Sequence, residues 1–534
     1  MKSLSQFQQR LALLSRPENN QLLAGVVRGI EKESLRVTPE GLLAKTPHPA
    51  ALGSALTHPE ITTDYSEALL EFITPPSGSV KHVYDNLEAL HQYTYRQIGD
   101  ELLWVNSMPC MLGHDNDTDI PEARYGSSNI GRMKRIYRIG LGHRYGRLMQ
   151  TIAGIHYNFS LPDSFWKVLQ QQDGDTGSLQ DYKTTGYFSL IRNFRRNFWL
   201  LLYLFGASPA VCRSFVRNRN HSLEPVNCDD HSLHSPYATS LRMGDLGYQS
   251  KAQDSLVVCY NNLENYIETL RGALTTSYPG YEKIGLKDDQ GNYRQLSNNL
   301  LQIENEFYSS IRPKRTAHSG EPPVAALWER GVEYIEVRCL DLNPLLPVGI
   351  EPMQMHFIDT FLVYCLLSDS PKTHTDEYHN ILENQRRMVY RGREPGLMLR
   401  NNGGETPLKD WAQKLFDGMA PIAEMMDAAS GGSEHSDALN HFGRRINQPE
   451  LTPSSILLNE LQSNCDTYFQ TALGYARQHR EYFLDKPLDP ALDEQFRAQA
   501  AQSLEEQKHI EQSDKVPFEQ FLAEFYQRYD FPLR

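Results

Sequence analysis

The sequence predicts an α+β fold built around a mostly antiparallel sheet, with a helical C-terminal portion. Short strand candidates recur as far as Leu340, and crossover helices do not separate them regularly, which weakens a doubly wound parallel sheet. From about Leu408 onward strand signals end and Ala- and Gln-rich helical patterns dominate. We therefore expect a catalytic α+β body over residues 1–400 and a helical region over residues 401–534 packed on it.

The strand candidates are short, and they alternate with helices along the body. The first follows an N-terminal helix and ends at the turn signal Thr38-Pro39-Glu40-Gly41. Strands are predicted at residues 26–37, 69–73, 152–161, 301–308 and 334–340. Helical periodicity predicts helices at residues 83–97, 187–205, 255–271 and 352–367.

Composition excludes several classes of partner. The 534 residues can bury a large core, and a net charge of −13 argues against nucleic acid, which needs a basic surface. The longest apolar run, at residues 198–205, is too short to cross a bilayer. The N-terminal segment is polar and lacks an apolar signal core, so we expect a cytoplasmic protein without a membrane partner.

The cysteine pattern predicts reduced thiols. The seven cysteines are odd in number and scattered, and they form no Cys-x-x-Cys pair. This fits an intracellular protein better than a disulfide frame or a zinc site.

Two strand candidates place carboxylates on an inward face. Alternation puts Glu31 and Glu33 on the same face as Leu35, while Glu336 and Arg338 share a face far downstream. Buried carboxylates require a cation, a metal ion or a strong hydrogen bond. Glu31 and Glu33 could approach hard cations such as Mg²⁺, or pair with arginines across the sheet. The opposite, wetter face of the first strand carries Arg28, Lys32, Ser34 and Arg36.

Residues 61–73 contain three further acids. Asp64, Glu67 and Glu71 have helical spacing, whereas Glu71 also fits the apolar face of a strand. In both cases Glu71 has apolar neighbours, and we expect Glu67 on a solvated helix face.

Two more strand candidates carry a polar face. His156, Asn158 and Ser160 alternate with apolar residues; a lone histidine is more often a core residue, but a whole polar face favours a site lining. In the 301–308 segment, alternation groups Glu304 with Glu306. A basic cluster follows, which is either a solvated face or a holder of phosphate oxygens: Arg312, Lys314 and Arg315.

The donor inventory favours magnesium–nucleotide chemistry. Carboxylates with one imidazole and several arginines suit Mg²⁺ better than Zn²⁺, which favours His/Cys sets. The sequence has no Gly-x-x-x-x-Gly-Lys-Ser/Thr loop and no Gly-x-Gly-x-x-Gly after a strand. ATP, if bound, would therefore be held through metals on carboxylates.

Several long motifs identify a family resemblance. They are Gly29-Ile30-Glu31-Lys32-Glu33-Ser34-Leu35-Arg36 and residues 61–74, 125–129, 154–160, 236–242, 301–315 and 334–338. In this order they resemble the proteobacterial glutamate–cysteine ligases (γ-glutamylcysteine synthetases), over about residues 20–400. The resemblance implies a curved antiparallel funnel like that of glutamine synthetase and the guanido kinases. It also implies ATP-dependent formation of γ-glutamyl phosphate and attack by the cysteine amine, the first step of glutathione biosynthesis, with Mg²⁺ or alternatively Mn²⁺. The partners we expect are the small molecules glutamate, cysteine and ATP, and we expect a monomer.

The resemblance also implies roles for individual residues. Arg338 would face the transferred phosphoryl group, Arg242 would clamp a substrate carboxylate with help from Arg138, and Glu336 would join them in catalysis. The cysteine pocket would be lined by Tyr137, Tyr248 and Tyr308. The metal ligands would be Glu31, Glu33, Asp64, Glu71, His156 and Glu336.

The sequence leaves two alternatives open. A related carboxylate–amine ligase of the same fold could use another amine acceptor, because acceptors differ only in pocket shape. A non-catalytic metal- or nucleotide-binding relative is disfavoured, because no acidic position of the metal set is replaced by a neutral residue.

Overall fold

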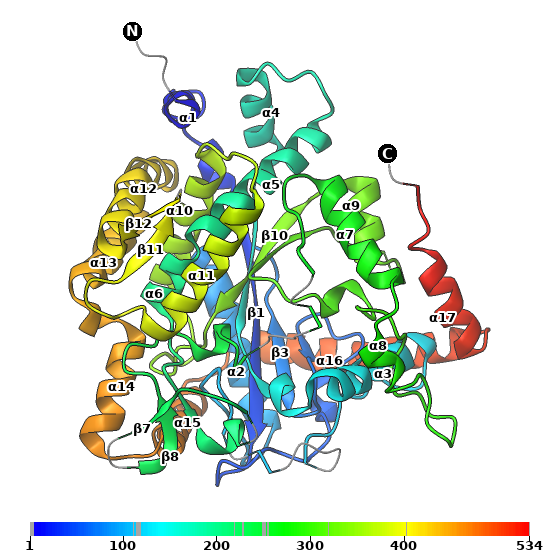
Figure 1. The fold of residues 1–534 in the computed structure, drawn as a ribbon. Coiled ribbons are helices and arrows are strands. Elements are labelled where there is room, and N and C mark those ends of the chain that lie inside the picture. The colour runs from blue at the N-terminus through cyan, green and yellow to red at the C-terminus, as the bar shows by residue number, and fades with distance from the viewer. Residues whose placement is uncertain are drawn as a thin grey trace.

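The computed structural model places an antiparallel sheet at the centre of the molecule (Figure 1). It describes residues 5–110, 112–113, 119–217, 219–226, 229–247, 252–253, 256–318, 320–401 and 403–532. Within these residues the strand order is β2-β3-β1-β5-β10-β9, every pair is antiparallel, and β4 also pairs with β1. The strands are β1 (Val27–Val37), β2 (Ile61–Thr63), β3 (Leu69–Ile73), β4 (Leu102–Leu103), β5 (Ile155–Ser160), β9 (Ile311–Lys314) and β10 (Tyr334–Leu340). The α+β prediction is confirmed.

Smaller sheets and many helices surround this sheet. One small sheet contains β6 (Ala210–Cys212), β7 (Glu224–Val226) and β8 (Asp229–His234), and a hairpin contains β11 (Met398–Asn401) and β12 (Gly404–Pro407). The helices are α1 (Gln6–Leu14), α2 (Val80–Gln97), α3 (Asn129–Tyr145), α4 (Asp163–Gln172), α5 (Leu179–Asn197), α6 (Trp199–Phe205), α7 (Leu263–Thr275), α8 (Pro279–Glu282), α9 (Pro323–Arg330), α10 (Pro352–Leu367), α11 (Thr375–Arg391), α12 (Leu408–Ser430), α13 (Glu434–Asn447), α14 (Pro453–Asn464), α15 (Tyr468–Asp485), α16 (Pro490–Ser513) and α17 (Phe518–Gln527). None of these helices is long and apolar enough to cross a membrane.

The side of β1 predicted to be wetter is in fact buried, so that expectation is wrong. Arg28 is 4% exposed and its Nε lies 2.8 Å from Oδ2 of Asp359 on α10. Lys32 is 5% exposed and its Nζ lies 2.6 Å from Nε2 of His91 on α2. Two helices thus cover this side and leave the acidic side of the sheet to form the site. Alternation assigns residues to faces, but it does not say what covers each face.

The C-terminal region is helical, as expected. After Pro407 the described chain contains only helices, with two of them, α12 and α13, packed on α10, and α15 packed on α2. The β11–β12 hairpin crosses residue 400. The division into residues 1–400 and 401–534 stays a prediction.

The predicted strand at residues 301–308 is wrong. This segment is irregular and contains a 3₁₀ turn at Glu304–Glu306, with both glutamates buried. Glu306 is held by Arg144 and Tyr145 of α3 at 2.8 and 2.6 Å. Interactions with residues far away in the sequence therefore shape this segment, and the local alternation did not reveal them.

Two other local predictions need correction. Glu67 lies in the turn between β2 and β3, is 5% exposed, and accepts the backbone N–H groups of His48 and Arg124 at 2.6 Å, so it is not on a solvated helix face. The helix predicted at residues 255–271 begins only at Leu263, because the side chain of Asn262 caps its N-terminus.

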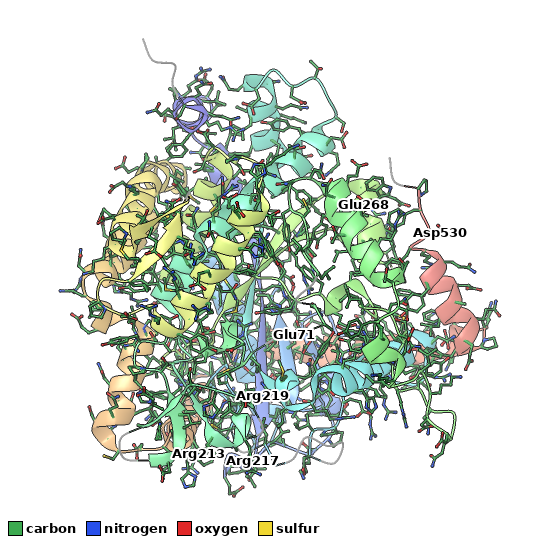
Figure 2. The ribbon with its side chains drawn as sticks, viewed as in Figure 1. Glu71, Arg213, Arg217, Arg219, Glu268 and Asp530 are labelled. Carbon is green, nitrogen blue, oxygen red and sulfur yellow. A yellow bond between two sulfur atoms is a disulfide. The ribbon has the colours of Figure 1, made fainter. Side chains whose placement is uncertain are left out.

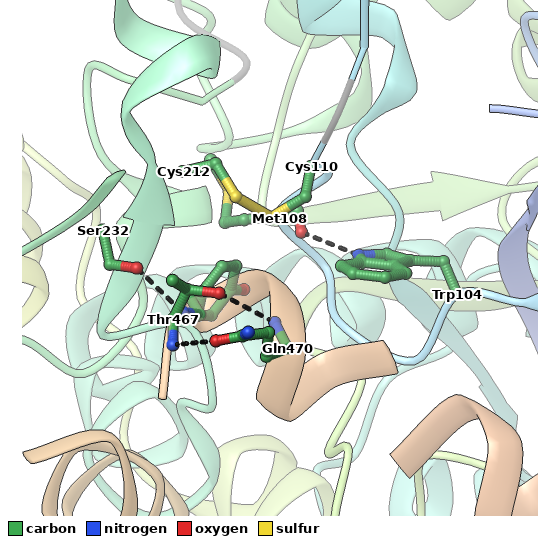
Figure 3. The surroundings of a disulfide bond; sticks show 8 residues. Trp104, Met108, Cys110, Cys212, Ser232, Thr467 and Gln470 are labelled. Atoms are coloured by element: carbon green, nitrogen blue, oxygen red, sulfur yellow. Dashed lines mark hydrogen bonds between the residues drawn. A yellow bond between two sulfur atoms is a disulfide. The ribbon is translucent and has the colours of Figure 1, made fainter. Parts of the chain in front are cut away.

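The cysteine prediction is also wrong. The sulfur atoms of Cys110 and Cys212 are 2.10 Å apart and form a disulfide (Figure 3). It joins the segment after β4 to β6, near the N-terminus of α15, where the backbone N–H of Tyr468 donates to Ser232 Oγ. Cys465 is disulfide-bonded as well. A separation of 102 residues leaves no local signal for such pairing.

Candidate active site

A cavity of about 500 Å³ lies on the acidic face of the central sheet. Residues of β1, β3, β5 and β10 form its floor, and α3 and the 303–308 segment line its walls. Glu71, on β3 of the central sheet, lies near the middle of the view in Figure 2. Side chains on sheet strands are held more rigidly than side chains on loops, so the floor is suited to precise chemistry.

The sheet register brings the predicted acids together. Glu33 pairs directly with Glu71 across β1 and β3, and Glu31 pairs directly with His156 across β1 and β5. Directly opposed residues of antiparallel strands project to the same side. Ligand atoms of Glu31, Glu71 and His156 accordingly all lie within 4.8 Å of one another. Glu33 lies beside them and accepts the N–H of Gly154 at 2.7 Å.

Glu31, Glu33 and Glu71 form an acidic end of the floor, and the other end, around Glu336, carries positive charge. Glu336 on β10 is 1% exposed, and its Oε1 lies 3.1 Å from Arg338 and 3.3 Å from Lys314. The residue directly opposite Glu336 on β5 is Asn158, whose side-chain amide donates to the carboxylate of Glu31 at 2.8 Å. His156 is central, because its Nδ1 lies 3.2 Å from Glu31 and 3.8 Å from Glu336.

The two ends of the floor shift carboxyl pKa values in opposite directions. Burial, followed by the charge of Asp64, raises the pKa of Glu33 to about 8. Burial and the neighbouring acids raise the pKa of Glu71 well above its ordinary value. Burial also opposes ionisation of Glu336, but the charges of Arg338 and Lys314 outweigh it and hold its pKa well below the ordinary value. At Glu33 and Glu71 the nearby arginines offset burial only in part, whereas at Glu336 the charges of Arg338 and Lys314 outweigh it.

His156 is suited to coordinate a metal ion. Burial and the positive charge of Arg338 lower its pKa. The imidazole is therefore neutral at physiological pH, and neutral imidazole is the form that binds metals.

Arg242 lines the cavity, although it is only 1% exposed. Its guanidinium donates to the backbone oxygen of Arg338 at 3.1 Å and lies 3.9 Å from the carboxylate of Asp341. A Cβ atom on Gly154 would lie 1.9 Å from this guanidinium, so the close approach requires glycine. These contacts fix the arginine in one position at the end of the floor.

The structure brings the other predicted substrate residues into the same cavity. Arg138 projects from α3, lies 4.5 Å over the ring of Tyr125, and donates to the backbone oxygen of Asp64. Tyr137 on α3 and Tyr308 on the 303–308 segment also line the cavity. Tyr248 lies outside the described residues. Every predicted site residue that the structure describes therefore lines this cavity.

Sequence reasoning missed Lys134 and Phe525, which also line the cavity. Lys134 lies 5.2 Å over the ring of Tyr125, and burial lowers its pKa to about 8. Its spacing of four residues from Arg138 on one helix was a signal that could have identified it. Phe525 comes from α17 near the end of the chain, where no local pattern points to a site.

Comparisons with known proteins agree with this geometry. The glutamate–cysteine ligase family model matches residues 11–388. The glutamate–cysteine ligases of Alcanivorax borkumensis and Saccharophagus degradans are 54% and 52% identical to this chain, over 98% and 96% of it and 100% and 96% of their own lengths.

Solved structures show the same relationship. The crystal structure of glutamate–cysteine ligase from Francisella tularensis in complex with AMP superposes with a TM-score of 0.88 at 39% identity, covering 94% of this chain and 98% of that chain. A bifunctional glutathione synthetase from Pasteurella multocida shares the fold, with a TM-score of 0.69 at 23% identity, over 90% of this chain and 55% of that chain. The chain belongs to the glutamate–cysteine ligase family.

Proposed function

We propose that this cavity joins the γ-carboxylate of L-glutamate to the amine of L-cysteine, with cleavage of ATP to ADP and phosphate. This is the first step of glutathione biosynthesis, and it proceeds through γ-glutamyl phosphate. The observation that supports this proposal most strongly is that one cavity contains both the acids Glu31, Glu33 and Glu71 and the arginines Arg338 and Arg242. The AMP bound by the Francisella tularensis relative supports a nucleotide as co-substrate.

The donor set fits magnesium. The Glu336 Oε2 atom is buried and has no hydrogen-bond partner among the described residues, so it is available to a cation. The raised pKa values of Glu33 and Glu71 indicate acids whose burial the nearby arginines offset only in part. Oxygen ligands with one imidazole suit Mg²⁺ or Mn²⁺. The residues that would hold the ions are Glu31, Glu33, Asp64, Glu71, His156 and Glu336.

In the first step, phosphoryl transfer requires positioning and charge neutralisation rather than a protein nucleophile. Bound Mg²⁺ supplies charge that offsets the repulsion between the nucleotide phosphates and the substrate carboxylate. Arg338 presents its guanidinium to the transferred phosphoryl group, held in place by Glu336 at 3.1 Å. Arg242, with help from Arg138, holds a substrate carboxylate.

In the second step, the amine must reach the acyl phosphate without competition from water. We assign the amine-acceptor subsite to Tyr137 and Tyr308, whose rings line the cavity, together with Tyr248. Aromatic rings present apolar surface with a polar tip, which suits a small thiol-bearing amino acid.

The acidic end predicts a pH-dependent response to magnesium. The pKa of Glu33 is raised from 4.5 to about 8 without metal, so between these values the folded protein keeps a proton that the unfolded chain has lost. The free energy of unfolding contributed by Glu33 therefore falls as pH rises through this window. Metal binds deprotonated carboxylates, so its stabilisation grows over the same window. We expect the Tm increase caused by Mg²⁺ to grow from about pH 6 to about pH 8.

Thermal unfolding with matched ionic strength measures this response. Glu33→Gln should remove much of the pH dependence of the Mg²⁺ effect, because the titrating carboxyl is lost. A Tm increase that is constant or shrinks with rising pH would show that the acidic end does not hold the metal.

The proposed activity is tested by ADP release with glutamate, ATP and Mg²⁺ while the amine is varied. We expect strong stimulation by cysteine and close analogues. Equal stimulation by unrelated amines would point to a ligase with another acceptor, and release with no amine dependence would exclude ligation. A glutamate-independent signal would exclude the proposed substrate.

We further propose that the enzyme acts as a monomer in the cytoplasm, where ATP and both amino acids are available, and that it uses only small-molecule partners. Its net charge of −13 supports the absence of nucleic acid. Light scattering during size-exclusion chromatography tests the oligomeric state, because a dimer mass at working concentration would overturn the monomer.

A further inference from the structure

The end of the chain contacts both walls of the cavity. Residues 511–532, which we name the C-terminal brace, comprise the end of α16, the helix α17 and the tail that follows. Phe525 of the brace lines the cavity itself. Figure 1 shows α17 at the side of the molecule, beside the part of the chain that contains α3, α8 and α9.

The first wall is α3, and the brace fixes its N-terminus. The backbone N–H groups of Ser127 and Asn129 donate to the carboxylates of Glu511 and Asp514. Carboxylates at a helix N-terminus satisfy free N–H groups and complement the helix dipole. One turn further on, Arg132 lies 4.5 Å over the ring of Phe518. The helix that carries Lys134, Tyr137 and Arg138 is thus anchored from the far end of the sequence.

The second wall is the 303–308 segment, which together with Gln302 we call the loop, and two tyrosines of the brace bond to this loop. Tyr526 donates to the backbone oxygen of Gln302 at 2.9 Å. Tyr529, which is 2% exposed, donates to Oε2 of Glu304, while Val324 N–H donates to Oε1 at 2.9 Å. Burial raises the pKa of Glu304, and the Tyr529 hydrogen bond counteracts this. Without Tyr529, a buried carboxylate oxygen would lose its donor.

The two walls also contact each other, next to the tyrosines that we assign to the amine-acceptor subsite. Gln302 donates to the backbone oxygen of Tyr137 at 3.2 Å, and Arg144 of α3 forms a fully buried pair with Glu306 at 2.8 Å. Tyr308 ends the same loop. The spacing between Tyr137 and Tyr308 therefore depends on how the loop is seated against α3.

We propose that the C-terminal brace sets the spacing of the two cavity walls, and that Tyr529 is a positioning residue for the amine-acceptor subsite through the Glu304 carboxylate. This rests on the proposed function. The metal-binding acids and Arg338 lie on sheet strands, except Asp64 in the turn after β2, and the brace residues that anchor the walls bond to none of them. Tyr526 and Tyr529 bond to the loop, whereas α3 carries Arg138, so the loss of either tyrosine hydroxyl should affect acceptor binding rather than phosphoryl transfer.

The test is Tyr529→Phe, which keeps the ring and removes only the donor. We expect the KM for cysteine to rise about tenfold, because a small displacement of the groups that contact cysteine weakens its binding strongly. The kcat and the KM for ATP should change less than about twofold. The control is Tyr475→Phe, which also removes a tyrosine–glutamate hydrogen bond, of 2.6 Å to Glu460, at a partly buried position between α15 and α14 that does not line the cavity. The control should leave all constants unchanged.

Two further variants make the result decisive. Adding Glu304→Gln to Tyr529→Phe should bring the KM for cysteine back toward the wild-type value, because no buried charge then lacks a donor. Tyr526→Phe should give the same split between constants, since it loosens the same loop. An unchanged KM for cysteine in both single variants, or a parallel loss in every constant, would overturn the proposal. Failure of the wild-type enzyme to use cysteine would instead overturn the proposed function.

Discussion

Replacing Glu336 by Gln is expected to reduce turnover by a factor on the order of 10³ while the protein stays folded. Glu336 is 1% exposed and contacts Arg338 and Lys314, and its second carboxylate oxygen has no hydrogen-bond partner among the described residues. Glutamine keeps the shape of the side chain, but it removes the negative charge that attracts Arg338, Lys314 and a metal ion. The fold should survive, because Glu31 and Glu33 of β1 still act electrostatically on Arg338, and Glu31 on Lys314.

Steady-state rates at saturating substrates measure the loss, and circular dichroism with thermal unfolding checks the fold. Glu333→Gln is the matched control, because Glu333 lies three residues away with an exposed side chain near Arg315. It should keep wild-type activity. Near-normal turnover in Glu336→Gln would show that Glu336 is not a metal ligand.

Replacing Arg338 by Lys is expected to lower kcat by about a hundredfold or more, although the charge is kept. Arg338 contacts Glu336 at 3.1 Å and His156 at 3.4 Å, and its Nε is buried with no hydrogen-bond partner in the described part of the chain. A guanidinium can hold Glu336 with one edge and face the phosphoryl group with another, whereas an ammonium is a single point of charge.

The decisive quantity is the split between kcat and KM. An interaction made mainly in the transition state lowers kcat and kcat/KM together. Arg497→Lys, at an exposed pair with Asp493 on α16, is the matched control and should be silent. A kcat within about twofold of wild type in Arg338→Lys would move Arg338 from the phosphoryl-facing role to a structural one.

Much of the floor of the site could be predicted from the sequence, because strand alternation has a period of two. Glu31, Glu33, His156 and Glu336 each lie on a strand that was predicted, and the structure places all four on the cavity floor. Local alternation sufficed to say which side chains share a face. The family resemblance was needed to relate these strands to one another and to the reaction.

Local patterns could not predict the walls of the site, although the resemblance named Tyr137, Arg138 and Tyr308 there, because contacts over long sequence separations shape the walls. Glu304 and Glu306 alternate as if on a strand, yet Tyr529 and Arg144 hold them in an irregular loop. The buried side of β1 carries Lys32 beside His91, a pairing that no local pattern contains. The disulfide between Cys110 and Cys212 likewise joins residues that are 102 positions apart, which no local pattern reveals. A single sequence contains no direct record of which distant segments meet.

The formation of γ-glutamyl phosphate in this cavity is tested most directly with glutamate carrying ¹⁸O in its γ-carboxylate. The enzyme is supplied with cysteine, unlabelled ATP and Mg²⁺, and the released phosphate is analysed by mass spectrometry. If the carboxylate attacks the γ-phosphorus of ATP and the cysteine amine then displaces phosphate, one carboxylate oxygen leaves with each phosphate. We expect phosphate that carries a single ¹⁸O atom, together with the γ-linked dipeptide. Unlabelled phosphate formed alongside that dipeptide would contradict the acyl-phosphate route.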